Sequence, residues 1–184
     1  MIEFDVRLIG NAALFFDAAA KRPDLDLIAG RVQPADRNWW WFPHLASADA
    51  RPWRCFFPVV RLSARAIDRL HAKRRDHSRT LSRIALWPND EAFVATTLVH
   101  EGLRHADLND LGHFYNDRTF SYENLLRDEG ADAGSGPPKL QHPVLDEESY
   151  ARKHARMQAG YRSDTLAFRI RRMLVRRING QRAW

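Results

Sequence analysis

The sequence contains one cysteine, Cys55, among its 184 residues. A single cysteine excludes a disulfide within the chain and a zinc site built from several thiolates. Any metal ion bound by this protein therefore needs histidine, aspartate or glutamate ligands. The chain offers 8 histidines and 23 acidic residues for that purpose.

Long apolar runs are also missing, and no stretch approaches the roughly 18 consecutive apolar residues of a membrane-spanning helix. The apolar residues 12–16 have Glu3 and Asp5 before them and Asp17 after them, and no basic segment precedes them. This pattern is not typical of a secretory signal peptide. We therefore expect a cytoplasmic protein, or one exported by a dedicated secretion system.

The length and a hydrophobic content of 45% predict one domain spanning residues 1–184. The residue patterns predict an α+β fold that is mainly helical with a small sheet. Pro58 favours an edge strand or a bulge, and residues 134–143, rich in glycine and proline, predict a loop. We expect strands at residues 2–9, 56–62 and 84–87. We expect helices at residues 11–21, from residue 63 onward and after Asn89. Residues 146–184 are expected to form a basic helical C-terminal region, with the helix reaching about residue 178.

Two histidines and a glutamate lie close together in the segment 96–106, namely His100, Glu101 and His105. In zincin-type metallopeptidases two histidines of one helix bind zinc, and the glutamate after the first is the base for zinc-bound water. The histidines of that pattern are normally four residues apart. Here they are five apart, so they would lie about 140° apart around a regular helix. We therefore expect a one-residue π-bulge, which the flexibility of Gly102 favours.

A third ligand is expected on a later helix, within residues 122–133. Asp128, Glu129 and Asp132 lie close together there. A glutamate closes the site in gluzincin-like proteins, so Glu129 is the first choice. Asp128 and Asp132 are the alternatives, either as the third ligand or as partners that orient a histidine.

The segments 98–106 and 129–133 resemble the H-E-L-R-H-A and E-A-D-A signatures of a group of small bacterial zincin-like metallopeptidases. Each signature carries an inserted glycine here, Gly102 and Gly130. The resemblance covers residues 84–133, the core motif region. It implies a zincin-like domain in which zinc-activated water cleaves a peptide or amide bond. The implied zinc ligands are His100, His105 and Glu129, and the implied general base is Glu101.

Other residues allow further interpretations of the same region. His113 is either another ligand or a loop histidine, and Tyr115 or Tyr122 could donate a hydrogen bond to the oxyanion. Glu101 with Asp110 also resembles the catalytic region of phage lysozymes, although their glycine-rich hairpin and threonine are missing here. A glycosidase is therefore the lesser alternative. The remaining interpretation is that the polar residues simply form the solvent face of an amphipathic helix.

The charge pattern supports a different class of function. The formal net charge is +6, and arginines alternate with apolar residues in the C-terminal region. A basic amphipathic helix suits nucleic acid, an anionic membrane or cell wall, or an acidic protein. A non-catalytic basic binding module is therefore the alternative to a hydrolase. Its surface would consist of Arg169, Arg171, Arg172, Arg176 and Arg177.

Overall fold

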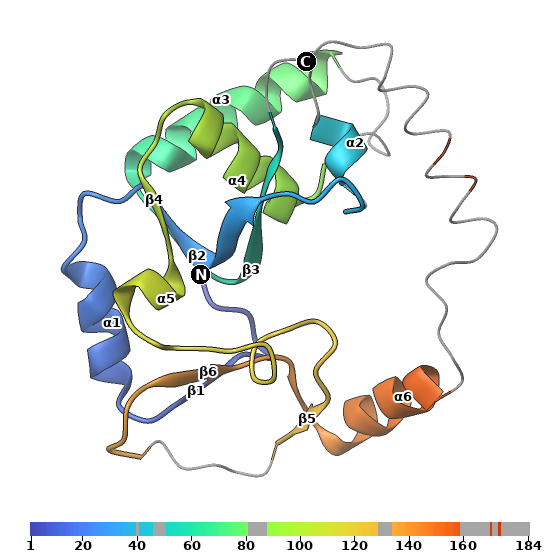
Figure 1. The fold of residues 1–184 in the computed structure, drawn as a ribbon. Helices are drawn as coiled ribbons and strands as arrows, with labels where there is room; N and C mark the ends of the chain where they lie inside the picture. The colour runs from blue at the N-terminus through green and yellow to red at the C-terminus, as the bar shows by residue number, and fades with distance from the viewer. Residues whose placement is uncertain are drawn as a thin grey trace. The chain divides into compact units, whose positions relative to one another are not determined.

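The computed structural model describes residues 1–39, 41–45, 51–80, 88–128 and 134–158, together with Ile170 and Met173. Helices and short strands are interspersed along the chain, and the strands form small sheets (Figure 1). This confirms the predicted α+β class. Residues 1–23 with 107–162 form one compact unit, and residues 24–106 with 163–184 form another. The expected single domain over residues 1–184 stays a prediction.

The unit around residues 24–106 contains a three-stranded sheet with the order β3-β2-β4. β2 and β3 pair antiparallel, and the register shifts on both sides of Gly30. Pro58 lies on β3, an edge strand of this sheet, as the sequence predicted. The strands are β2 (Leu27–Pro34), β3 (Trp53–Leu62) and β4 (His105–Asp107).

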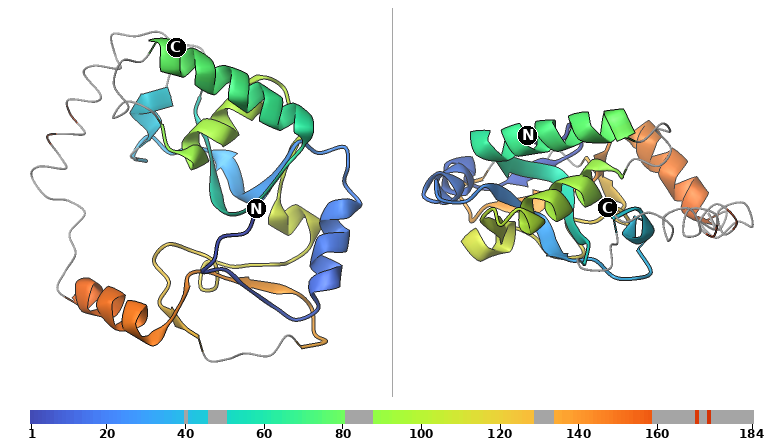
Figure 2. Two further views of the ribbon diagram at one scale, coloured as in Figure 1. Left: turned by 180° about the vertical axis from the view of Figure 1, so that it is seen from behind. Right: turned by 90° about the horizontal axis from the view of Figure 1, so that it is seen from above.

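Two helices, α3 (Ala64–Thr80) and α4 (Asp90–His100), pack against each other and share one hydrophobic core with β2 and β3 (Figure 2). Asn89 is the N-cap of α4, and its side chain accepts a hydrogen bond from the Ala92 amide at 3.1 Å. Phe93 and Leu98 of α4 are 2% and 0% exposed. The short helix α2 (Phe42–Leu45) lies between β2 and β3 in the chain.

Asp26 joins three segments of the same unit. Its carboxylate accepts hydrogen bonds from Arg65 Nη2 at 2.6 Å, from Ser63 Oγ at 2.7 Å and from the Arg104 amide at 3.0 Å. The guanidinium of Arg65 lowers the pKa of this carboxyl to about 2, against the opposing effect of burial. The start of α3 and the segment before β4 are thereby tied to the start of β2.

The other unit contains small sheets and the remaining helices. β1 pairs antiparallel with β6, and β5 pairs parallel with β7. The helix predicted at residues 11–21 is α1, and Asn11 is its N-cap, with a side chain that accepts a hydrogen bond from the Ala13 amide at 3.0 Å. The elements are β1 (Arg7–Ile9), α1 (Ala12–Ala20), α5 (Leu108–Leu111), β5 (Leu126–Arg127), β6 (Lys139–Gln141), β7 (Val144–Leu145) and α6 (Glu147–Gln158).

Several predicted boundaries change. The strand expected at residues 2–9 is limited to β1, because the chain turns at residues 4 and 5. The loop expected at 134–143 contains β6. The expected strand at 84–87 lies outside the described residues, and so does most of the expected helix beyond 158. Among the helices that the structure describes, none is long and apolar enough to cross a membrane.

Candidate metal centre

The helix α4 does not extend into the second half of the His-Glu-x-x-x-His pattern. It ends at His100, Glu101 is its C-cap, and Gly102 has a left-handed backbone with φ of +72°. The amide of Leu103 donates a hydrogen bond to the carbonyl of Leu98 at 2.9 Å. A glycine of positive φ combined with this bond is the Schellman end of a helix. The expected π-bulged helix is therefore wrong, because Gly102 ends the helix instead of distorting it.

The first histidine and the glutamate lie at this helix end and face different partners. The Nε2 atom of His100 lies 2.8 Å from the carbonyl oxygen of Arg51. The Oε2 atom of Glu101 lies 3.8 Å from Nε of Arg69, and the two side chains are 35% and 63% exposed, respectively. Both contacts are typical of polar side chains at a helix C-terminus.

The second histidine, His105, belongs to β4 and not to the helix. Its ring packs edge-on against Trp53, with the ring centroids 5.1 Å apart. Within the part of the chain that the structure describes, His100, Glu101 and His105 do not form a group whose ligand atoms surround one point. The sequence motif is therefore divided between a helix end and a strand.

The expected third ligand, Glu129, lies outside the described residues, and so does Asp132. Asp128 is described and forms an ion pair with Arg7. The expected helix at 122–133 is wrong for its described part, which consists of turns and β5. The metal site of His100, His105 and Glu129 stays a prediction.

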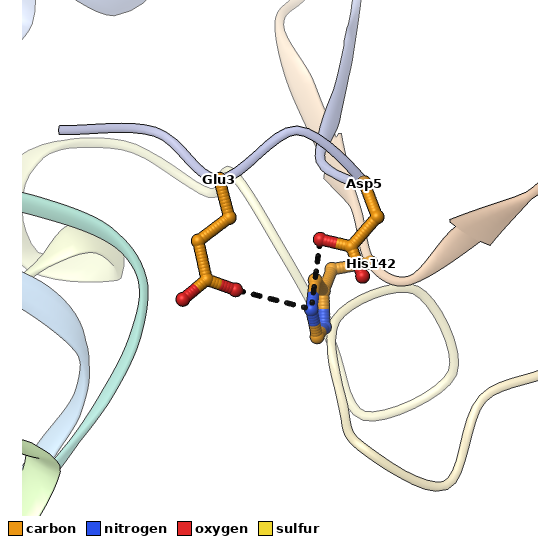
Figure 3. Close-up of side chains that lie close together, drawn as sticks. All are labelled: Glu3, Asp5 and His142. Carbon is orange, nitrogen blue, oxygen red and sulfur yellow. Dashed lines mark ion pairs between the residues drawn. The ribbon is translucent and has the colours of Figure 1, made fainter.

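A different set of ligand-type side chains does converge, namely Glu3, Asp5 and His142 (Figure 3). One ligand atom from each lies within 4.8 Å of the others. The Nε2 atom of His142 is 3.5 Å from Oδ1 of Asp5 and 3.9 Å from Oε2 of Glu3. Among the residues with described positions, these three form the one group that could share a metal ion.

Backbone and ring contacts hold His142 in place. Its amide donates a hydrogen bond to the Thr119 carbonyl at 2.7 Å, and its carbonyl accepts bonds from the Ser121 amide and the Asn124 side chain. Its ring packs edge-on against Phe120, with the centroids 5.8 Å apart. The His142 side chain is only 5% exposed, whereas Glu3 is 41% exposed. The cluster thus has one fixed, buried ligand and a carboxylate that solvent reaches.

The environment keeps the imidazole of His142 neutral. Burial lowers the pKa of His142 below its usual value of 6.5, and the charge of Asp5 only partly offsets this effect. A neutral imidazole is the form that binds metal ions, since protonation occupies the ligating lone pair. At neutral pH the cluster therefore presents one nitrogen lone pair and two carboxylates.

The three ligand atoms lie close enough together for one metal ion to contact all of them. Separations of 3.5 and 3.9 Å exceed the usual hydrogen-bond length. Ligands bound at 2.0–2.1 Å to a tetrahedral zinc ion are about 3.4 Å apart. One nitrogen and two oxygen ligands suit zinc and neighbouring divalent metals.

Sequence reasoning missed this cluster because its members come from distant parts of the chain. Glu3 and Asp5 lie just before β1, and His142 follows β6 directly. The antiparallel pairing of β1 with β6, in which Arg7 is opposite Gln141, brings them together. The sequence contains no local signal for the cluster, because it predicts a loop over residues 134–143 and does not predict β6. No family model, curated protein or solved structure matches this chain.

Proposed function

We propose that this protein is a metal-dependent hydrolase that binds a divalent cation, zinc first among the candidates, through Glu3, Asp5 and His142. The observation that carries the proposal is the convergence of these three ligand atoms within 4.8 Å. Histidine nitrogens and carboxylate oxygens are both zinc ligands, and neither needs a thiolate. Three protein ligands also leave a coordination position open for water.

The chemistry follows from that donor set. A divalent ion with an open position lowers the pKa of bound water and polarises a carbonyl group. His142 keeps its nitrogen lone pair available because burial lowers its pKa. A peptide or amide bond is the substrate that the resemblance of residues 98–106 and 129–133 to metallopeptidase signatures implies, and we keep it as the proposed substrate class.

Of Tyr115 and Tyr122, the two tyrosines that could donate a hydrogen bond to the oxyanion, Tyr122 is the better placed. The hydroxyl of Tyr115 donates to both carboxylate oxygens of Asp107, at 2.7 and 2.8 Å, and is occupied by that contact. Tyr122 is 59% exposed, and its ring centroid lies 6.2 Å from that of His142. We therefore propose Tyr122 as the hydrogen-bond donor to the substrate carbonyl.

The ligand set implied by the sequence remains a second hypothesis for the same activity. It uses His100, His105 and Glu129 as zinc ligands and Glu101 as general base. Elsewhere in the chain, Asp110 accepts a hydrogen bond from the Asp107 amide at 2.9 Å and so caps α5. The lysozyme-like role of Glu101 and Asp110 stays the lesser alternative.

Metal analysis of the full chain without a histidine tag tests the proposal and separates the two ligand sets. About one zinc ion per chain is expected in the wild type and in His105→Ala. We expect its loss in Glu3→Gln and in His142→Ala. Glu148→Gln is the matched control for Glu3→Gln, because it removes the same charge from a side chain that is 90% exposed.

The opposite pattern, with zinc kept in Glu3→Gln and lost in His105→Ala, would favour the ligand set implied by the sequence. No stoichiometric metal in the wild type, even after zinc is supplied, would contradict both sets. The basic binding module would then be the leading hypothesis. Its five C-terminal arginines, Arg169, Arg171, Arg172, Arg176 and Arg177, lie outside the described residues.

A further inference from the structure

A lysine from α6, Lys153, contacts the same turn as His142 of the cluster of Glu3, Asp5 and His142. The ammonium group of Lys153 donates hydrogen bonds to the carbonyl of Tyr122 at 2.9 Å and to that of Asn124 at 2.6 Å. These bonds direct the charged end of the side chain toward the turn at residues 121–124. None of the α6 side chains is fully buried, but Lys153 is partly buried.

The same turn holds the buried histidine. The side-chain amide of Asn124 donates to the carbonyl of His142 at 3.1 Å, and the ring of Tyr122 packs edge-on against the His142 ring. Tyr122 and Asn124 each contact both Lys153 and His142, so a single residue connects the lysine to the histidine. Burial lowers the pKa of Lys153, whereas the charge of Asp5 acts in the opposite direction. The ammonium thus lies within the electrostatic reach of Asp5 and His142.

We propose that Lys153 acts as an internal counter-charge that weakens cation binding at Glu3, Asp5 and His142. This inference rests on the proposed metal site. The carboxylates of Glu3 and Asp5 contribute two negative charges, and the Lys153 ammonium offsets one of them. An incoming divalent ion is repelled by the ammonium, so the site binds it less tightly than its ligands alone would.

The physical basis is the Coulomb interaction in a partly buried setting. Near a protein surface the effective dielectric constant is about 20, so charges several ångströms apart still interact by more than thermal energy. The hydrogen bonds from Lys153 to the backbone carbonyls of Tyr122 and Asn124 also restrain its ammonium group from moving away when the ion arrives. The effect should weaken as salt is added, because salt screens charges that solvent reaches.

Zinc titration calorimetry on the full chain tests this inference. Lys153→Gln removes the charge and keeps a hydrogen-bond donor, so we expect it to bind zinc about tenfold more tightly than the wild type. Lys153→Arg keeps the charge and should bind like the wild type. Lys139→Gln is the matched control, because Lys139 also donates to a backbone carbonyl, that of His113 at 2.5 Å. It lies in the same unit, and its loss should leave the affinity unchanged.

The outcomes separate the two proposals. Equal or weaker zinc binding by Lys153→Gln, with a circular dichroism spectrum like that of the wild type, would overturn the counter-charge role while leaving the metal site intact. A similar gain in Lys139→Gln would also overturn it, because net charge alone would then be responsible. If Lys153→Gln does not fold, Lys153→Met replaces it in the comparison. Absence of zinc binding in the wild type would reject the metal site itself.

Discussion

The amide of Leu103 donates a hydrogen bond to the carbonyl of Leu98 at 2.9 Å, across the glycine that ends α4. Both side chains belong to the hydrophobic core, with exposures of 8% and 0%. The helix end is therefore stabilised by side-chain burial as well as by the backbone of Gly102. This contact separates His100 from His105, since it ends the helix before the second histidine is reached.

Gly102→Ala should destabilise the protein by about 1 kcal/mol, because a left-handed backbone disfavours a β-carbon. No other atom lies within 4 Å of the position that this carbon would occupy, so backbone strain is the only cost. Urea denaturation at neutral pH measures the change. Gly136→Ala is the control, because its added carbon also meets no atom within 4 Å and its φ is not positive. Equal stability of the two variants would contradict this account.

Asp26→Asn should cost about 2 kcal/mol at neutral pH, because the charged hydrogen bonds from Arg65 and Ser63 are weakened. The folded-state pKa of Asp26 is lowered from 3.8 to about 2, so its contribution is complete above pH 3.8. That contribution is lost as the pH falls toward 2. Urea denaturation between pH 7 and pH 2 should therefore show the two proteins converging in acid.

The control for Asp26→Asn is a carboxylate whose loss leaves the hydrogen bonds of Asp26 unchanged. Asp68 lies exposed on α3, and Asp68→Asn removes the same charge. We expect its free energy of unfolding to stay within about 0.5 kcal/mol of the wild type. A loss as large as that of Asp26→Asn would mean that net charge, and not the contact with Arg65, is responsible.

The imidazole of His142 should titrate with a midpoint below 6.5, because burial lowers its pKa. Nuclear magnetic resonance of the histidine ring protons measures this midpoint, and the missing resonance of His142→Gln assigns it. If the cluster binds zinc, zinc affinity should be constant above pH 6.5 and fall only below that midpoint. A midpoint above 6.5 would show that the carboxylates of Glu3 and Asp5 dominate over burial.

Cys55 should react slowly with thiol reagents in the folded protein. Its side chain is 4% exposed, and burial raises the pKa of the thiol well above its usual range. In buffer, modification of Cys55 with a chromogenic disulfide should be no faster than unfolding of the protein. In urea that unfolds the protein, modification should be immediate. Rapid reaction in buffer would contradict the burial of this β3 residue in the core shared with α4.

The sequence predicted best those features that neighbouring residues determine. Asn89 caps α4 at the start of the helix that the sequence predicted after it, because an N-cap depends on side chains within one helical turn. The α+β class and the edge position of Pro58 were also predictable. In contrast, a glycine in a histidine-rich segment suits either a distorted helix or a helix end. Only the packing of Leu98 and Leu103 decides between them for Gly102.

The candidate metal cluster could not be predicted in this way. Glu3 and Asp5 precede β1 and His142 follows β6, and nothing local to either segment indicates that these strands pair. Hydrophobic periodicity predicts that a strand exists, but partner and register depend on the whole fold. The burial of His142 likewise depends on Phe120 and Tyr122, which reach it only after the chain has folded.

Asp26 also bears on how long the unit around residues 24–106 stays folded. Its carboxylate bonds to Ser63 and Arg104 span 37 and 78 positions of the chain. Such distant contacts close large loops, and we expect them to form after the rate-limiting step of folding. Weakening them should therefore leave the folding rate nearly unchanged and accelerate unfolding. This single carboxylate would thus determine the lifetime of the folded state more than the speed at which it is reached.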